Sequence, residues 1–217
     1  MKKVFLALLA GLAVLLAACG NGGGAPSGAG AKTVAGVSRG NPLLVNKEQK
    51  TVTVYTEVNG KYFTTPTRHG VVFKDGSNGD KAILKAWVSP QDFYKALADI
   101  GGVPGNNVTL ETKNAVVGGS DLQMKVTWEG AGREYDFAQI VKDDAGQGFK
   151  PRFGGNEERA AAKKTGCIFC LDSCPVGITS NAAYPQGSFD SGKVKFFGNQ
   201  ELLPPDGTPV AVIFSLK

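Results

Sequence analysis

The chain has 217 residues, of which 42% are hydrophobic and 20% are charged, and its formal net charge is +5. This length is sufficient for one domain of ordinary size. The 30 Gly and 11 Pro favour strands and turns over a helical bundle. A single His excludes a multi-histidine metal centre, and the small positive net charge gives no support for nucleic-acid binding.

The first 18 residues have the pattern of a secretory signal peptide. Lys2 and Lys3 precede an uncharged apolar run that is shorter than the ~20 residues of a membrane-spanning helix. The run ends in Leu16-Ala17-Ala18-Cys19, which resembles the lipobox of bacterial lipoproteins. That resemblance implies cleavage before Cys19, acylation of its thiol, and an extracytoplasmic protein anchored to the cell membrane or an outer membrane. The alternative is an ordinary cleaved signal peptide followed by a chance cysteine.

Residues 19–41 are predicted to be a lipidated, Gly-rich tether. Residues 20–40 hold eight Gly and almost no large apolar side chain, so this stretch cannot bury enough surface to order. A flexible coil of this length reaches roughly 25 Å. The folded part is therefore expected over residues 42–217, as a single domain.

The first half of this domain is expected to begin with strands. Residues 51–58 place three Val on one face and polar residues opposite, and Ala82 to Val88 form a second apolar run. His69 lies between these strands, and we interpret it as a solvated loop residue.

One helix is predicted over residues 89–100. Ser89 offers an N-cap and Pro90 suits the first helical position. Apolar residues follow at helical spacing, and Gly101-Gly102 ends the pattern.

Three further strand segments complete the predicted sheet. Residues 121–141 alternate apolar and polar side chains on both sides of Gly130-Ala131-Gly132, which predicts a β-hairpin. Residues 193–197 and 210–216 are the remaining strand candidates. The pattern as a whole indicates an α+β fold, with an antiparallel or mixed sheet and one or two short helices.

A second short helix, 157–164, leads into a Cys-rich loop over residues 166–177. Cys167, Cys170 and Cys174 follow the spacing C-x2-C-x3-C-P, which matches the end of the bacterial ferredoxin cysteine run. The first cysteine of that run is replaced by Lys164, so we expect no iron–sulfur cluster.

Four uses of these thiols stay open. The thiols can be ordinary core residues, or two of them can form a structural disulfide, which an extracytoplasmic compartment favours. Alternatively, the three thiolates can bind a thiophilic metal ion, with His69 or a water as the fourth ligand. Finally, the Cys167–Cys170 pair can perform thiol–disulfide exchange.

An ordered set of motifs resembles the YdjY-domain family over residues 45–217. The motifs are Val88 to Leu97, Ile100 to Gly105, Val126 to Gly130, Gly166 to Gly177, Ser180 to Ala182, and Leu203 to Val210. The resemblance implies a shared fold and a shared cysteine segment, and it assigns no activity.

The sequence predicts a membrane-anchored binding or assembly module with a structural Cys-rich loop, and its expected partners are the bilayer and an envelope protein. We find no acid–base constellation typical of an enzyme. The alternative function is a redox or metal-binding component, including ferredoxin-like electron transfer, built on the three thiols of the loop.

Overall fold

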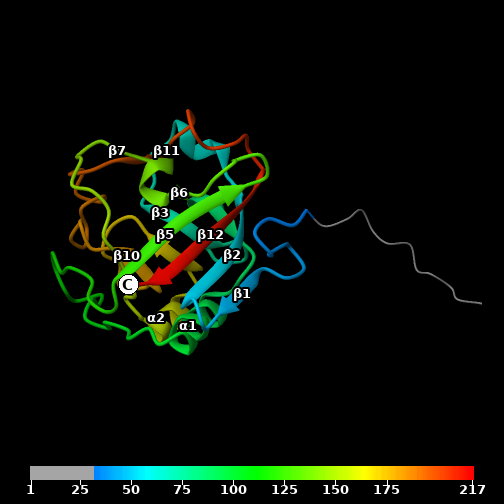
Figure 1. The fold of residues 1–217 in the computed structure, drawn as a ribbon. Coiled ribbons are helices and arrows are strands. Elements are labelled where there is room, and N and C mark those ends of the chain that lie inside the picture. Colours follow the sequence, from blue (N-terminus) through cyan, green and yellow to red (C-terminus); the bar gives the residue numbers. More distant parts are fainter. Residues whose placement is uncertain (1–31) are drawn as a thin grey trace, which may run out of the picture. The chain divides into compact units, whose positions relative to one another are not determined.

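Strands dominate the fold. The computed structural model describes residues 32–217, and within this range one ten-stranded mixed sheet curls around the core (Figure 1). The predicted signal peptide, Cys19 and the first part of the predicted tether lie outside the described residues. The mixed sheet and the two short helices agree with the predicted α+β class, although strands contribute far more of the fold than helices.

The elements of the described range are as follows. The strands are β1 (Leu43–Asn46), β2 (Thr51–Val58), β3 (His69–Phe73), β4 (Ala82–Ala86), β5 (Leu122–Trp128), β6 (Tyr135–Asp136), β7 (Val141–Asp143), β8 (Pro151–Arg152), β9 (Cys167–Cys170), β10 (Thr179–Asn181), β11 (Phe196–Gly198) and β12 (Pro209–Leu216). The helices are α1 (Pro90–Asp99) and α2 (Glu157–Lys163), with short 3-10 helices at Gly60–Phe63, Gly79–Lys81 and Phe137–Ile140.

The sheet follows the order β6-β5-β12-β2-β4-β3-β9-β10-β8, with β1 also paired to β2. Neighbouring strands are antiparallel except in the pairs β3–β4 and β9–β10. Strands β7 and β11 form a separate two-stranded ribbon. In Figure 1, β2, β12 and β5 cross the front of the molecule, and α1 and α2 lie together at one end.

Strand β2 is predicted correctly in its limits, but it is buried on both faces instead of one. Residues 32–41 explain the difference. Val34 and Val37 are buried against Tyr55 and Ala211, and the Arg39 guanidinium donates to Glu57. This last part of the predicted tether is therefore folded, because two apolar side chains and one ion pair hold it on the sheet.

Both predicted helices are confirmed. The Ser89 hydroxyl accepts from the backbone N–H of Asp92, Pro90 occupies the first turn, and Phe93 and Leu97 are fully buried. Helix α2 begins with two Glu and ends at Lys163, so its charges complement the helix dipole as expected.

The second arm of the predicted hairpin is wrong beyond its first residues. Strand β6 pairs with β5 only at Tyr135–Asp136, and a 3-10 helix with a capping box replaces the strand at Phe137–Ile140. Phe137 and Ile140 stand one 3-10 turn apart and are both buried. A turn of helix places both in the core, whereas a strand would place them on opposite faces.

The predicted Cys-rich loop is also partly wrong. Residues Cys167–Cys170 form strand β9, and all four are fully buried. Ile168 and Phe169 join the main core, whereas the two Cys belong to a smaller cluster. The irregular part of the segment is therefore confined to residues 171–178, between β9 and β10. Strand β11, Phe196–Gly198, overlaps only the end of the predicted strand 193–197.

Candidate metal centre

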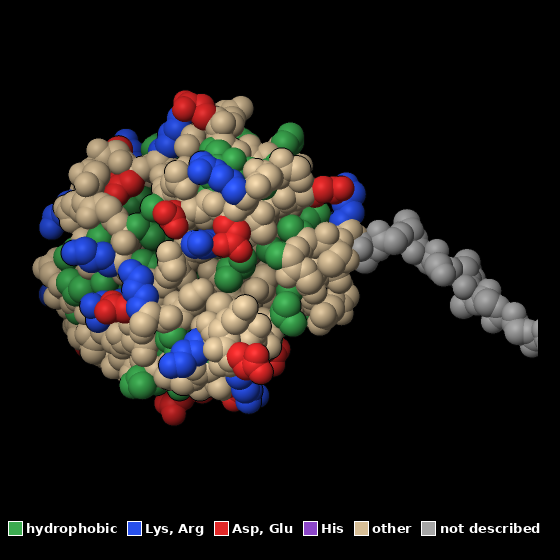
Figure 2. Space-filling view, in the orientation of Figure 1, with side chains coloured by type: hydrophobic (Ala, Val, Ile, Leu, Met, Phe, Trp, Pro, Cys, Tyr) green, Lys and Arg blue, Asp and Glu red, His purple; other side chains and the backbone are tan. Residues whose placement is uncertain are grey.

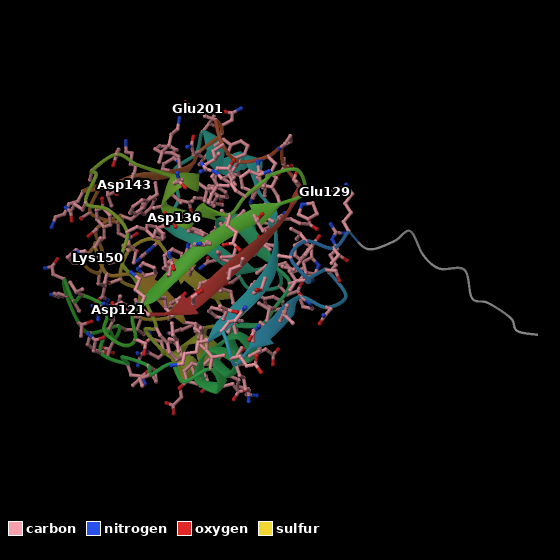
Figure 3. All side chains as sticks on the ribbon, in the orientation of Figure 1. Asp121, Glu129, Asp136, Asp143, Lys150 and Glu201 are labelled. Carbon is pink, nitrogen blue, oxygen red and sulfur yellow. The ribbon has the colours of Figure 1, made fainter. Side chains whose placement is uncertain are left out.

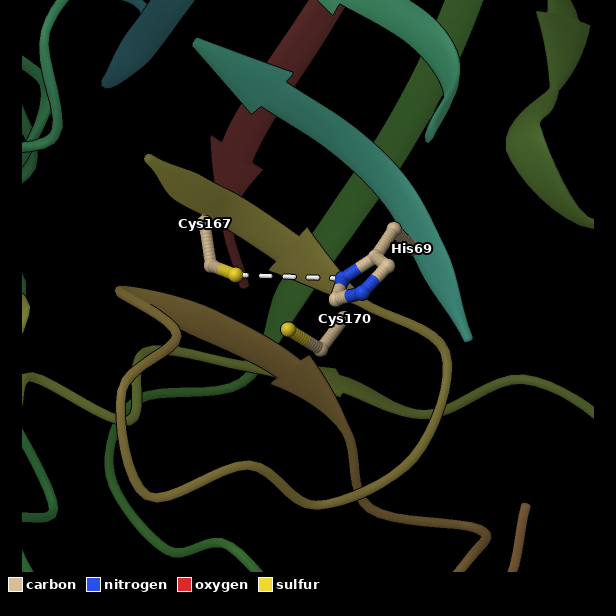
Figure 4. Close-up of side chains that lie close together, drawn as sticks. All are labelled: His69, Cys167 and Cys170. Carbon is tan, nitrogen blue, oxygen red and sulfur yellow. Dashed lines mark hydrogen bonds between the residues drawn. The ribbon is translucent and has the colours of Figure 1, made fainter. Parts of the chain in front are cut away.

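Strands β3 and β9 bring the single His of the chain to two of its cysteines. The two strands are antiparallel, and His69 lies opposite Cys170 in their register. His69 Nδ1 is 3.8 Å from Cys167 Sγ, and the ligand atoms of His69, Cys167 and Cys170 all lie within 4.8 Å of one another (Figure 4). The prediction of His69 as a solvated loop residue is wrong, because it begins strand β3 and is half-buried.

A signal for this placement exists in the sequence. Val71, Val72 and Phe73 follow His69 closely, and such a β-branched and aromatic run indicates a strand. The run therefore extends β3 back to His69. What the sequence does not show is that β9, about 100 residues later, pairs with this strand.

Cys174 lies beside these ligand atoms, but it does not belong to the set within 4.8 Å, which in the described chain comprises His69, Cys167 and Cys170. It joins Cys167 and Cys170 in one buried cluster with Val72 and Ala82. Cys167, Cys170 and Cys174 are free thiols in this structure. A disulfide between two of them, which the cysteine count and the compartment favour, stays a prediction. Cys167 and Cys170 are fully buried, and Cys174 is 4% exposed.

The thiols interact strongly with one another. Hydrogen bonds from the Cys170 and Cys174 thiols lower the pKa of Cys167 well below its ordinary value. The same contact with Cys167 raises the pKa of Cys170. One sulfur of the group therefore carries negative charge readily, which is the state that binds metals.

His69 is neutral at ordinary pH. Burial lowers its pKa to about 4, against a partial opposing effect of Cys174. A neutral imidazole has a free lone pair on one ring nitrogen and can serve directly as a metal ligand.

Hydrogen-bond donors surround the sulfurs. The Asn78 amide nitrogen lies 4.0 Å from Cys167 Sγ, and Thr165 also contributes to the low pKa of Cys167. The hydroxyls of Thr165 and Ser180 are buried, and neither has a partner at ordinary hydrogen-bond distance. Such orphaned hydroxyls are costly unless a charged acceptor, such as a thiolate, lies beside them.

Gly177 packs closely against one of the sulfurs. A Cβ on this residue would lie 3.0 Å from the backbone oxygen of Thr179, 3.1 Å from Cys170 Sγ and 3.1 Å from Ser180 Oγ. Any larger residue at 177 would therefore crowd the sulfur, the hydroxyl and the backbone of β10.

The segment between β9 and β10 is fixed from several sides. Asn156, which is buried, donates its side-chain amide to the carbonyl oxygens of Cys174 and Gly177. The Ser173 hydroxyl accepts from the backbone N–H of Val117. Asp172 is fully buried and accepts two hydrogen bonds from Arg68. The position of Cys174 is thus determined by buried hydrogen bonds that sequence reasoning did not identify.

Arg68 and Asp172 shift each other's pKa, and the neighbouring thiols also shift both pKa values. Burial chiefly raises the pKa of Asp172 to about 6, although Arg68 acts in the opposite direction. Burial tends to lower the pKa of Arg68, but Asp172, Cys174 and Cys170 outweigh it and raise that pKa. A partly buried cation, a buried anion and three thiols therefore share one environment.

Comparison with known proteins places this site within a family. A family model described as YdjY domain matches residues 43–215. An Escherichia coli (strain K12) protein named "Uncharacterized protein YdjY" is 46% identical over 183 residues, which cover 83% of this chain and 81% of that protein. The chain belongs to the YdjY-domain family. No solved structure matches it.

The matched range of the YdjY domain contains His69 and all three cysteines of the cluster. It excludes residues 32–41, which pack on β2 from outside. The candidate metal centre therefore lies within the family domain.

Other parts of the described YdjY-domain chain offer less chemistry. Five labelled acids in Figure 3, Asp121, Glu129, Asp136, Asp143 and Glu201, lie apart around the face shown and form no carboxylate pair there. Figure 2 shows positive and negative side chains interspersed on the same face, without a continuous basic patch. Within residues 32–217, neither helix is long and apolar enough to cross a membrane.

Proposed function

We propose that the protein binds one thiophilic metal ion, such as Zn²⁺, through Cys167, Cys170, Cys174 and His69. The observation that carries this proposal is the clustering of one ring nitrogen of His69 and the Sγ atoms of Cys167 and Cys170 within 4.8 Å of one another. Zinc bonds of about 2.3 Å to sulfur and about 2.0–2.1 Å to nitrogen, at tetrahedral angles, separate these ligand atoms by about 3.6 Å. The separation of 3.8 Å between Cys167 Sγ and His69 Nδ1 is close to that value.

The donor set also favours a single thiophilic ion. Three thiolates and one imidazole are soft or intermediate ligands, which suit zinc and Cu(I) far better than calcium or magnesium. An iron–sulfur cubane distributes its cysteines over several iron atoms, so its cysteine sulfurs stand further apart than ligands of one ion. The close spacing at His69, Cys167 and Cys170 therefore supports the expectation that the protein holds no such cluster.

Lys164 supports the same conclusion. It stands where the first cysteine of a ferredoxin run would be, and it forms the exposed C-cap of α2 with left-handed backbone. Residue 164 therefore supplies no thiolate for an iron–sulfur cluster.

The ion would have a structural role. Four protein ligands leave no open coordination position, whereas catalytic zinc sites keep one for water or substrate. Cys167 and Cys170 are fully buried. They are therefore poorly placed for thiol–disulfide exchange with another protein, because the attacking sulfur must reach a sulfur of that protein's disulfide. We therefore favour a metal-stabilised binding or assembly module over an enzyme.

We also propose, from the N-terminal sequence pattern, that this module lies outside the cytoplasm. Acylation of Cys19 would anchor it to a bilayer, and residues 20–31 would connect the anchor to the folded part that begins near Val34. Fatty-acid labelling of the wild type should be absent in Cys19→Ala, and that variant should be released from membranes or left unprocessed. Labelling that persists undiminished in Cys19→Ala would contradict the anchor.

Metal content tests the central proposal. The full chain, purified in detergent under reducing conditions and exposed to Zn²⁺, should retain one zinc ion per chain after desalting. Cys170→Ser and His69→Ala should each retain much less, because each removes one ligand. Cys19→Ser is the matched control and should retain one ion, because Cys19 is not in the cluster. Retention of no zinc by the wild type, or of stoichiometric iron and sulfide, would overturn the proposal.

A further inference from the structure

We propose that Arg68 is a positioning residue of the metal site, and that it sets the metal affinity by balancing the negative charge of buried Asp172. This inference rests on the proposed metal site. It concerns residues that do not ligate the ion themselves.

The two residues connect the elements that carry the ligands. Arg68 directly precedes His69, which is the first residue of β3, and Asp172 lies between Cys170 and Cys174. The Arg68 Nε and Nη2 atoms donate to Asp172 Oδ1 at 3.1 Å and 2.8 Å. The Arg68 carbonyl also accepts from the backbone N–H of Leu171 at 2.8 Å. Arg68 therefore attaches the cysteine segment to the strand of the imidazole ligand by both backbone and side chain.

The charges explain why this attachment matters for metal binding. Three thiolates with one divalent ion carry a net charge of −1. Asp172 is fully buried and adds a second negative charge beside them, which the Arg68 guanidinium cancels. Without Arg68, a buried and unpaired carboxylate would stay beside the thiolates, and its negative charge would repel theirs and weaken the binding of the ion.

Asp190 does not alter this balance to the same degree. It accepts from Arg68 Nη1 at 2.6 Å, but its side chain is 63% exposed, whereas that of Asp172 is 0% exposed. Solvent screens the exposed carboxylate, so its charge acts weakly on the buried sulfurs.

The charge account predicts opposite results for the two partners. Arg68→Gln should weaken Zn²⁺ binding, measured by competition with a chelator, by about 10- to 100-fold, which is the usual effect of losing a residue that supports metal ligands. Asp172→Asn keeps an acceptor for Arg68 but removes the negative charge. It should therefore bind Zn²⁺ at least as tightly as the wild type. Arg152→Gln, which breaks the exposed ion pair with Asp121, is the matched control and should leave the affinity unchanged.

The outcomes separate this inference from the metal site itself. If the wild type binds no Zn²⁺, the proposed function fails. If the wild type binds and Asp172→Asn is weakened as strongly as Arg68→Gln, the pair has only a structural role and the inference fails. Wild-type affinity in a folded Arg68→Gln would also overturn it.

A second readout covers the case in which Arg68→Gln does not fold. Co²⁺-loaded Asp172→Asn should then keep the thiolate-to-cobalt absorption of the wild type together with an equal or tighter Zn²⁺ affinity. Lower affinity or loss of that absorption in Asp172→Asn would contradict the charge account.

Discussion

Two regions of the sheet are built in different ways. The regular region comprises β2, β12 and β5, and the cysteine region comprises β3, β9, β10 and residues 171–178. Strand β12 pairs with β2 and with β5 over seven successive residues each, without a register shift. Strands β3 and β9 share three residue pairs, and the register shifts between each of them and the next.

The side chains buried in the two regions also differ. The regular region is filled mainly by apolar side chains such as Val54, Val212 and Phe214, and the polar residues that it buries, Thr53, Thr56 and Glu57, all belong to β2. The cysteine region buries polar groups, namely Asp172, Ser173, Thr179, Ser180 and Asn181, beside its thiols. Buried polar groups add little stability unless they are fully satisfied, but they fix geometry. The comparison indicates that the regular region supplies stability and the cysteine region supplies a site.

The largest effect should come from a core truncation in the regular region. Phe214 is fully buried, and its ring lies 4.7 Å from that of Phe93 on α1. Phe214→Ala should lower the free energy of unfolding by about 3–5 kcal/mol, because it leaves a cavity. Denaturant titration measures this loss. The folded fraction should still bind one metal ion, and a variant as stable as the wild type would refute the assigned role of this region.

A smaller loss is expected from overpacking the cysteine region. In Gly177→Ala, the new Cβ would press on the backbone oxygen of Thr179 and on Cys170 Sγ, so we expect a loss of about 1–3 kcal/mol of stability together with weaker metal binding. Gly40→Ala is the control, because a Cβ at residue 40 meets nothing within 4 Å. Unchanged Zn²⁺ affinity in Gly177→Ala would mean that the packing of residue 177 against Cys170 does not affect the site.

The smallest effect should come from the N-cap of α1, which lies outside both regions. Ser89→Ala removes the acceptor for the Asp92 N–H and should cost about 1 kcal/mol of stability. Ser89→Asp restores an acceptor and should recover most of that loss. Equal thermal stability of Ser89→Ala and the wild type would show that the cap contributes nothing.

The sequence predicts the regular region well because its information is local. Alternation along β2 and β5 and the cap of α1 depend on neighbours within a few residues. The failures have physical reasons too. Residues 32–41 looked too Gly-rich to fold, yet Val34, Val37 and Arg39 find partners on β2. The 3-10 helix after β6 depends on the core that receives Phe137.

The candidate site was only partly predictable. The spacing of the three cysteines leaves core packing, a disulfide, a metal ion and thiol–disulfide exchange open, and His69 is the one imidazole of the chain. Their meeting depends on the pairing of β3 with β9, which joins residues about 100 positions apart. Arg68 and Asp172 carry no motif, because their role arises only when the two strands lie side by side.

The coordination of bound zinc tests the central claim most directly. X-ray absorption at the zinc edge of the reduced, zinc-loaded protein should show three sulfur ligands at about 2.3 Å and one nitrogen ligand at about 2.0–2.1 Å. In the smaller amount of zinc that His69→Ala still retains, the nitrogen contribution should disappear while the three sulfurs stay. A first shell dominated by oxygen, or one that is unchanged in His69→Ala, would contradict a metal centre formed by Cys167, Cys170, Cys174 and His69.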